Sequence, residues 1–414
     1  MRHVKCLSIF FVLSSLCATT LFAEEADNKV KLGGELRLRN ENYLNQQKIV
    51  GGTVDDDAMV LLRGRINVDA TPVEQVHVFL QPQFSRTFAQ EGSTVANGTA
   101  IDDLDLHQAF VEFLKINESG FSVKAGRQEL YYGDARLVGN GAWTNVGRNF
   151  DALKLRYAGE KFWVDAFGSW VVKSGPNQYF SGLYGSYTGW AKHSIDPYLF
   201  YLHSNAGSPA ADKLKLATPG VRFVGSHEAW DYGAEAALQL GKSEPNNALA
   251  YAGHAHGGFT FEQSWKPRLG AEYNFASGDK VSTSKHELFN RLFPTNHTKY
   301  GLMDLVGWRN IHDMSINFSA KPNEKWLVGT EYHLFMLPEV ANGLYRDNGT
   351  LLRAGAAGSS RLAGHEVDLT AQFIWNKYAD FLLGYSFFKT GKFFSDTGSS
   401  GLMHFAYLQA TAKF

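Results

Sequence analysis

Long runs in which apolar and polar side chains alternate constrain the fold of this chain more than any other feature. In residues 58–70, Leu62 and Ile66 alternate with Arg63 and Arg65. Strict alternation is typical of a β-strand whose two faces meet different surroundings. The other clear runs lie at residues 30–42, 229–241 and 365–376. Each run has about 12 residues, whereas strands of soluble proteins average about five or six. We therefore interpret the runs as tilted strands that cross a membrane.

The charged face of these strands indicates which side contacts lipid. An Arg or Lys that faces lipid at the middle of a bilayer costs roughly 2–4 kcal/mol. The polar faces of the first two runs carry Arg37, Arg39, Arg63 and Arg65. Together they would cost on the order of 10 kcal/mol, which is about the stability of a whole domain. We therefore expect the apolar face to contact lipid and the polar face to enclose water. Closing the sheet into a barrel also leaves no unpaired backbone group in lipid.

The connections between the runs alternate in length. Short polar turns are expected near residues 71–72, 117–120, 159–161, 194–196, 226–228, 264–266, 321–324 and 375–377. Longer connections rich in Gly, Ser and Asp are expected at 43–57, 86–103, 129–149, 173–180, 205–216, 242–249, 278–311, 339–363 and 389–401. They join about 18 strands and place both termini on the short-turn side, which is periplasmic in bacterial barrels.

The two ends of the chain agree with export to the outer membrane. Arg2 and Lys5 precede a short apolar stretch, and a small residue, Ala23, precedes two glutamates. This pattern predicts a signal peptide over residues 1–23. Both cysteines lie inside it, so disulfides are excluded from the mature chain. The last run ends in Phe414, which resembles the assembly signal of outer-membrane barrels, and only His404 interrupts its apolar face.

The fold prediction is an all-β, transmembrane antiparallel β-barrel of about 18 strands, with short periplasmic turns and long extracellular loops. Residues 24–414 form this barrel as a single domain in the bacterial outer membrane. No stretch of 18 or more uncharged apolar residues follows the signal peptide, which excludes transmembrane helices. The formal net charge of −1 excludes a globally basic nucleic-acid binder.

A barrel of this size leaves a lumen wide enough for solutes unless loops or a plug fill it. Basic inward positions are dense in the first third of the chain, whereas carboxylates such as Glu331, Glu366 and Asp368 dominate the last third. Rings of Arg and Lys favour anions. One interpretation is therefore an anion track along the early strands; the alternative is that these charges pair across the lumen. The candidates that the alternation places in the lumen are Arg37, Arg39, Arg63, Arg65, Lys124, Lys154 and Arg156.

Two long segments carry a family resemblance. Residues 126–156 contain GRQEL, YGD, RLVG, W-x-N and GR-x-FDA, and residues 277–310 contain SGD, FN-x-LFPTNHTKYG and MDLVGWRN. With these motifs the chain resembles the alginate export family of outer-membrane β-barrels. The resemblance implies an eighteen-stranded barrel and passive passage through an electropositive pore, and the best-known members of the family export the anionic polysaccharide alginate. The connection at 278–311 is unusually long, and we expect that it either folds over or into the lumen as a gate or forms an ordered surface cap.

By the same resemblance, five basic residues become candidates for contact with carboxylates, which suit guanidinium forks. They are Arg127, Arg136, Arg148, Lys154 and Arg156. Glu129, Asp134 and Asp151 are nearby in the sequence. They offer the alternative that the arginines are held in structural ion pairs.

The functional prediction is a passive outer-membrane porin for anionic oligo- or polysaccharide such as alginate, or for related small polar solutes. The expected partners are outer-membrane lipid and the solute. Envelope export proteins are possible further partners, and nucleic acid is not expected as one. We expect no enzyme activity, no catalytic residues, no cofactor and no metal. His254 and His256 share one strand face and could bind a metal, although such a pair is more often a girdle or loop feature. The alternatives are a general or other substrate-specific porin, an outer-membrane lipase or protease, and a plugged surface receptor.

Overall fold

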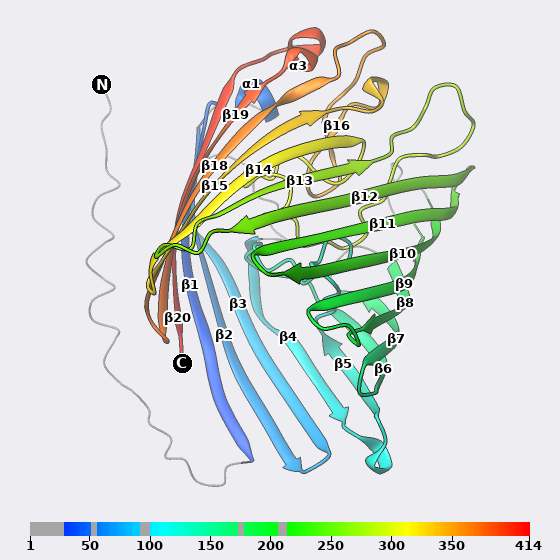
Figure 1. Cartoon of the computed structure of the whole chain (residues 1–414), viewed down its shortest axis with the longest axis vertical. Coiled ribbons are helices and arrows are strands. Elements are labelled where there is room, and N and C mark those ends of the chain that lie inside the picture. Colours follow the sequence, from blue (N-terminus) through cyan, green and yellow to red (C-terminus); the bar gives the residue numbers. More distant parts are fainter. Residues whose placement is uncertain (1–28, 51–55, 92–99, 173–177, 206–212) are drawn as a thin grey trace.

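The computed structural model describes residues 29–50, 56–91, 100–172, 178–205 and 213–414. The predicted signal peptide, residues 1–23, lies outside these described residues. Eighteen antiparallel strands form one sheet that closes on itself, because β1 pairs with both β2 and β20 (Figure 1). The predicted barrel and its strand number are confirmed. Among the described residues, no helix is long and apolar enough to cross a bilayer.

The first half of the barrel consists of β1 (Val30–Leu44), β2 (Asp57–Val73), β3 (Val76–Glu91), β4 (Asp102–Phe113), β5 (Phe121–Gln128), β6 (Phe150–Ala158), β7 (Phe162–Val171), β8 (Gln178–Tyr187) and β9 (His193–Ser204). The second half consists of β10 (Leu214–His227), β11 (Trp230–Ser243), β12 (Asn246–Thr260), β13 (Arg268–Ala276), β14 (Ile311–Asn323), β15 (Trp326–Met336), β18 (Leu362–Asn376), β19 (Ala379–Thr390) and β20 (Leu402–Lys413). The connections carry the minor elements α1 (Gln47–Val50), η1 (Ile116–Glu118), η2 (Val340–Asn342), β16 (Leu344–Tyr345), β17 (Leu351–Arg353) and α3 (Lys392–Thr397).

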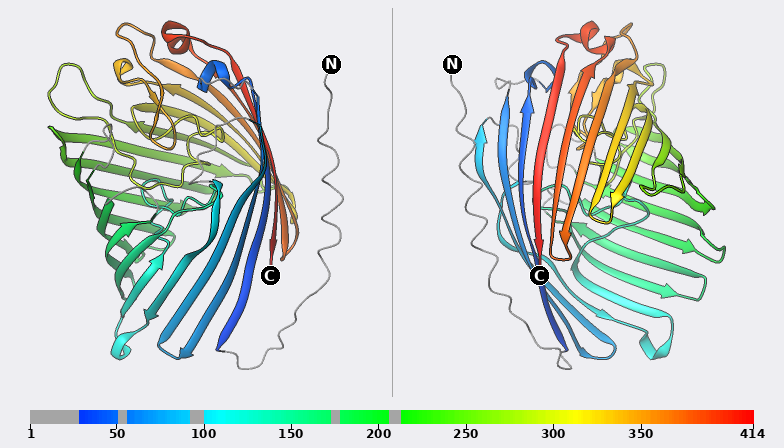
Figure 2. Two further views of the ribbon diagram at one scale, coloured as in Figure 1. Left: turned by 180° about the vertical axis from the view of Figure 1, so that it is seen from behind. Right: turned by 60° about the vertical axis from the view of Figure 1, so that its left-hand side comes forward.

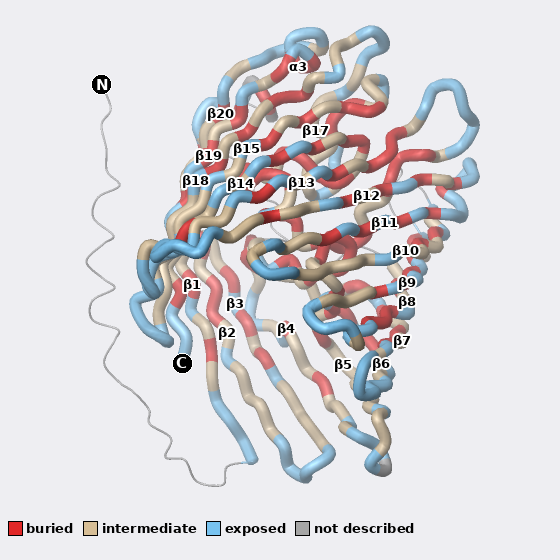
Figure 3. Tube along the Cα trace, viewed as in Figure 1, coloured by how far each residue is buried: buried red, intermediate tan, exposed pale blue. Residues whose placement is uncertain are grey.

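Burial alternates along the strands as the sequence pattern predicts, and Figure 3 shows buried and exposed positions following one another. On β6, Leu153 and Leu155 are exposed, whereas Phe150 and Ala152 are buried. The exposed apolar positions face outward toward lipid. The polar positions face inward, where the long loops cover many of them.

Long loops and short turns lie at opposite ends of the barrel, with α3 at the loop end (Figures 1 and 2). Three predicted connections were misplaced. Residues 71–72 lie within β2, and the turn follows them at 74–75. Residues 194–196 lie within β9, and the turn precedes them at 188–192. The predicted long connection 242–249 is a two-residue turn, Glu244-Pro245, between β11 and β12. Its polar flanks look like loop residues but are strand partners, Lys242 with Asn247 and Ser243 with Asn246.

The chain end closes the barrel. The backbone of Phe414 accepts from Gly34 N–H at 2.9 Å and donates to its carbonyl at 3.2 Å. The Phe414 ring covers Gly34 so closely that a Cβ there would lie 2.3 Å from Phe414 Cζ and 2.6 Å from the Arg65 carbonyl. Only glycine fits at this position.

Candidate functional site: the lumen and its inward-folded loops

Two long loops, residues 129–149 and 277–310, fold into the lumen and join there; we call them the inner loop pair. Phe293 exchanges backbone hydrogen bonds with Leu137 and Gly139, both at 2.8 Å. Thr295 donates to the Ala135 carbonyl at 2.9 Å. These loops contain the two segments that carry the family resemblance. The motifs, far apart in the sequence, therefore build one structure.

Inward side chains from the wall hold the second loop of the pair. Gln239 on β11 exchanges hydrogen bonds of 2.6 and 2.7 Å with the backbone of Asn290. Glu366 on β18 accepts from Met303 N–H at 2.9 Å. From about residue 287 onward, the loop that the sequence left open as a gate or a surface cap thus lies inside the barrel, whereas residues 280–285 are exposed at the rim.

All four of the predicted track arginines donate to backbone carbonyls of the first loop. Arg37 donates to the carbonyls of Ala142 and Thr144 at 2.9 and 3.0 Å. Arg39 donates to the Trp143 carbonyl at 2.8 Å. Arg63 donates to the Ala142 carbonyl at 3.2 Å, and Arg65 donates to the Val146 carbonyl at 3.4 Å. Arg37, Arg39 and Arg63 are at most 4% exposed, so solvent in the lumen hardly reaches them.

Carboxylates on the same wall neutralise part of this charge. Arg63 pairs with Glu35 at 2.6 Å, and Arg39 pairs with Glu41 at 2.6 Å. These contacts match the alternative in which the early charges pair with one another. They also make the early arginines structural supports of the inner loop pair.

Arg136 lies inside the inner loop pair and is almost fully buried. It pairs with Glu272 at 2.6 Å and with Asp134 at 3.0 Å, and it donates to Asn274 at 3.0 Å. Burial alone would disfavour its charge, but Tyr300, Glu272 and Asp134 outweigh burial and raise the pKa of Arg136. Carboxylates therefore hold this arginine, as the structural alternative expects.

Arg148 differs from Arg136 because its hydrogen-bond partners are backbone carbonyls. It donates to Pro294 O at 2.8 Å and to Gly139 O at 3.3 Å. Burial, together with the charge of Arg291, lowers the pKa of Arg148 to about 9. Like Arg136, it ties the two loops to each other.

Aromatic packing fills the lumen beside β6–β9. Tyr132 from the first loop stacks on Phe167 and Tyr184, at 5.6 and 4.7 Å between ring centroids. Phe293 from the second loop packs edge-on against Phe180 at 4.9 Å. These buried rings give the inner loop pair a rigid apolar seat on this wall.

Below this seat, three predicted cations face the lumen with partial exposure; we call Lys124, Lys154 and Arg156 the basic wall. Asp165, which is 0% exposed, accepts from Arg156 at 2.6 and 2.9 Å and lies 3.4 Å from Lys154. The Arg156 guanidinium also lies 4.4 Å from the ring centroid of Trp163.

Lys124 pairs with Glu112 at 3.1 Å. His77 also approaches Glu112, at 3.5 Å. The basic wall thus faces two carboxylates, and one of them is shared between two cations. The structure brings these three predicted residues together.

Arg127 does not join the basic wall. It follows Lys124 by three positions on β5 and therefore lies on the opposite, outward face. There it pairs with Asp151 at 2.8 Å and approaches Asp105 at 3.5 Å. A shift of one residue along a strand moves a side chain to the other face. Arg127 became a candidate through its motif, whereas strand parity would have placed it outside.

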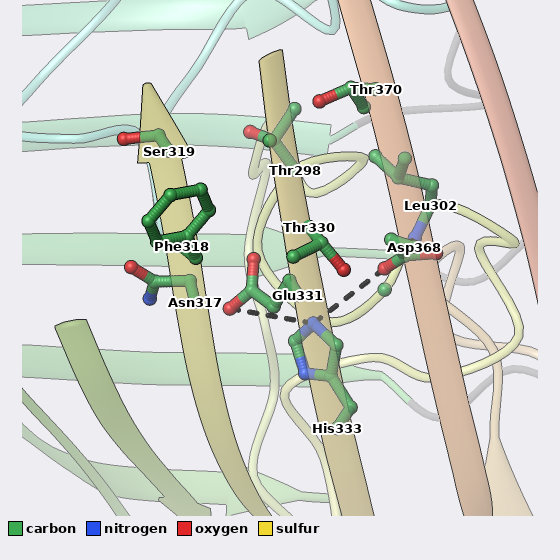
Figure 4. Close-up of a pocket in the computed structure, with 12 residues that line it drawn as sticks. Thr298, Leu302, Asn317, Phe318, Ser319, Thr330, Glu331, His333, Asp368 and Thr370 are labelled. Atoms are coloured by element: carbon green, nitrogen blue, oxygen red, sulfur yellow. Dashed lines mark hydrogen bonds and ion pairs between the residues drawn. The ribbon is translucent and has the colours of Figure 1, made fainter. Parts of the chain in front are cut away.

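The late strands form an acidic wall around a cavity of about 270 Å³ beneath the second inner loop. His333 lines this cavity, with Nε2 3.6 Å from Glu331 and 3.8 Å from Asp368. Figure 4 shows the imidazole pointing between these two carboxylates. Asp313 holds the other ring nitrogen at 2.9 Å. The carboxylates were expected in the lumen. His333 was missed, although it shares the face of Glu331 at the alternate position of β15.

The histidine pair considered for metal is a hydrogen-bonded pair. His254 Nε2 lies 2.9 Å from His256 Nδ1, and His254 Nδ1 lies 2.8 Å from the Asn274 side chain. Within the described ranges, no group of three or more His, Cys, Asp or Glu side chains could hold a metal ion.

The same fold occurs in solved outer-membrane structures of low sequence identity. The outer membrane protein OprD from Pseudomonas aeruginosa has a TM-score of 0.63 at 11% identity, over 94% of this chain and 94% of that chain. Acinetobacter baumannii OccAB2 has a TM-score of 0.62 at 11% identity, over 93% and 98%. Pseudomonas aeruginosa OccK11 has a TM-score of 0.60 at 12% identity, over 93% and 96%. At these identities the likeness shows the fold alone.

No curated protein sequence matches the chain significantly. The family described as alginate export matches residues 28–407, which include both segments of the inner loop pair. The resemblance found in the sequence is thereby confirmed. The chain belongs to the alginate export family, and it forms an outer-membrane porin channel in bacteria.

Proposed function

We propose that this channel passes anionic oligo- and polysaccharides, such as the uronate chain alginate, by passive diffusion. The observation that supports this most is the basic wall, where Lys154 and Arg156 share the single buried carboxylate of Asp165. A carboxylate that serves two cations leaves part of their charge for a passing anion. Basic side chains lining a pore favour anions.

The geometry of the basic wall suits a charged sugar. Arg156 is 40% exposed along its side chain and lies against Trp163. A guanidinium fork fits a carboxylate, and an aromatic ring offers a flat apolar surface to a sugar ring. Uronate residues present both a carboxylate and such a ring face. Transport requires contacts that are weak enough to release, and partly solvated pairs meet that condition.

The loops at the outer end add further positive charge. Arg148, Arg291 and Arg346 all interact with one carboxylate, Asp347. Burial lowers the pKa of Arg291 to about 10, so it is charged at neutral pH. An anion that crosses the channel would therefore meet positive charge at both ends of the inner loop pair.

The test is single-channel recording in planar bilayers. In a salt gradient, we expect the sign of the reversal potential to show a preference for anions. We also expect oligouronates to block the channel at concentrations at which neutral malto-oligosaccharides do not. The triple variant Lys124→Gln/Lys154→Gln/Arg156→Gln should show a weaker anion preference and weaker block by oligouronates. Arg127→Gln, on the outward face, is the matched control and should change neither.

Equal passage of neutral and anionic oligosaccharides would replace the proposal with a general porin. An unchanged reversal potential in the triple variant would show that the basic wall does not set the anion preference. A barrel that conducts almost nothing would favour the plugged receptor instead.

A further inference from the structure

Three tyrosine–histidine pairs repeat on the outward face of the barrel. In each pair a Tyr hydroxyl lies within hydrogen-bond distance of a His Nδ1 on the neighbouring strand. The pairs are Tyr273–His312 at 2.7 Å, Tyr332–His365 at 2.6 Å and Tyr385–His404 at 2.8 Å. They connect β13 with β14, β15 with β18, and β19 with β20.

The histidines of all three pairs lie near the loop end of the barrel. His312 and His404 are among the first residues of β14 and β20, which both follow long loops. His365 lies directly opposite Lys389 in the β18–β19 ladder. The loop end of such barrels is extracellular, so this row meets the headgroup region of the outer leaflet.

The tyrosine hydroxyl occupies Nδ1 of each histidine and leaves Nε2 for other partners. A hydroxyl that donates to Nδ1 leaves the proton of a neutral imidazole on Nε2. No other described residue forms a hydrogen bond with Nε2 of His312, His365 or His404. The tyrosines themselves are about 40% exposed. With the hydroxyl as the donor to Nδ1, each pair presents an Nε2–H to the surroundings of the barrel.

We propose that this row, together with Lys389, binds the phosphate groups of phosphorylated lipid headgroups in the outer leaflet. Phosphate oxygens are strong acceptors for N–H donors, and a nearby ammonium strengthens such bonds. The repetition of one geometry on three strand pairs provides several contacts along the membrane surface. This inference concerns the outside of the barrel and does not depend on what passes through the lumen.

Two other outward arginines near the loop end are already paired with carboxylates. Arg86 pairs with Asp103, and Arg127 pairs with Asp151. Because these cations already have carboxylate partners, the β3–β6 face offers little to a phosphate. The proposed contacts are therefore confined to the face of β13–β20.

A fourth pair at the opposite end provides a matched control. His193 Nε2 lies 2.8 Å from the Tyr232 hydroxyl, and His193 Nδ1 lies 2.7 Å from the Ala191 carbonyl. Both ring nitrogens have partners there. This pair has the same chemistry as the row but no free donor.

The experiment titrates the purified barrel in detergent with bis-phosphorylated lipid A and counts bound lipid by native mass spectrometry. Monophosphorylated lipid A and phosphate-free glycolipid of matched acyl chains are the comparison ligands. We expect retention to fall in that order. The variant His312→Phe/His365→Phe/His404→Phe should retain lipid A about tenfold less well, while His193→Phe should behave as the wild type.

The variant Tyr273→Phe/Tyr332→Phe/Tyr385→Phe keeps the imidazoles but removes the hydroxyls that orient them, and it should show an intermediate loss. Heat-modifiable migration in gels verifies that every variant is folded. Equal retention of phosphorylated and phosphate-free lipid would overturn the proposal, as would an equal loss in His193→Phe. Displacement of lipid A by excess inorganic phosphate alone would indicate a free-phosphate site and would also overturn it.

Discussion

The indole ring of Trp143 stacks on the imidazole ring of His297, with 3.4 Å between centroids and 6° between planes. Trp143 belongs to the first loop of the inner loop pair and His297 to the second. The Arg39 guanidinium lies 3.6 Å from the centroid of Trp143. Burial, reinforced by Arg39, lowers the pKa of His297 to about 3, so a neutral imidazole takes part in the stack at physiological pH.

Replacing this indole should loosen the inner loop pair. Trp143→Ala removes the stack on His297 and the contact with Arg39, and large-to-small changes of aromatic residues in packed sites cost about 3 kcal/mol. We expect a lower thermal unfolding temperature, together with larger and noisier single-channel conductance. Trp170→Ala, on the outward face, is the control and should leave conductance unchanged. If the conductance and noise of Trp143→Ala equal those of the wild type, the stack does not restrain the loops.

The anchoring arginines and the basic wall should respond differently to neutralisation. Arg37→Gln removes the shorter of two contacts at each of the Ala142 and Thr144 carbonyls, which keep only Arg63 at 3.2 and 3.3 Å. The loss of a hydrogen bond from a charged donor costs about 1.5–3 kcal/mol. We expect open-channel noise to rise and stability to fall, with a small change in reversal potential. Arg156→Gln should change the reversal potential at nearly constant noise. The two recordings are made on the same bilayer set-up, and an identical response of both variants would contradict the division of roles.

Asp347 should make anion preference depend on pH. Burial raises the pKa of the Asp347 carboxyl to about 7, well above its ordinary value near 4. As pH falls through about 7, the folded protein takes up a proton that the unfolded chain would not yet bind. Between about pH 7 and 4 the fold is therefore progressively stabilised, and this stabilisation is lost again as pH rises to about 7.

Protonation of Asp347 also removes the negative charge that faces Arg148, Arg291 and Arg346. We expect reversal potentials to show stronger anion preference at pH 6 than at pH 8. Asp347→Asn should hold the pH 6 behaviour at both values and flatten the pH dependence of thermal unfolding. A variant that keeps the wild-type pH dependence would assign it to another group.

Closure of the barrel should depend on the glycine beneath the last ring. Gly34→Ala places a methyl group against the Phe414 ring and the Arg65 carbonyl, and at least the ring must move. We expect a smaller folded fraction in heat-modifiability assays after refolding. Gly253→Ala is the matched control, because the nearest atom to its Cβ is 3.8 Å away. Equal folding yields would show that the C-terminal contact is dispensable.

Strand positions could be predicted because one physical rule governs every strand: lipid excludes charge from one face and water accepts it on the other. That rule placed Arg63, Lys124 and Arg156 on the inward face. It could not show whether an inward side chain meets water or a folded loop. Arg37 and Arg39 are covered by the backbone carbonyls of residues 142–144, and carbonyls have no signature in the sequence.

The errors have similar causes. The turn at Glu244-Pro245 was hidden because strands of a large barrel extend beyond the bilayer, so polar residues such as Asn247 still pair. His333 was missed because one histidine among carboxylates gives no periodic signal. The motifs at 126–156 and 277–310 indicated the family, but only the fold shows that they bind each other.

The pairing of the inner loops has a consequence for the order of assembly. One partner follows β5 and the other follows β13, so eight strands separate them along the chain. The two segments can bind each other only once β6–β13 stand in the sheet, whichever end of the chain is inserted first. A barrel that closes before the pair has formed would hold a pore without its internal restriction.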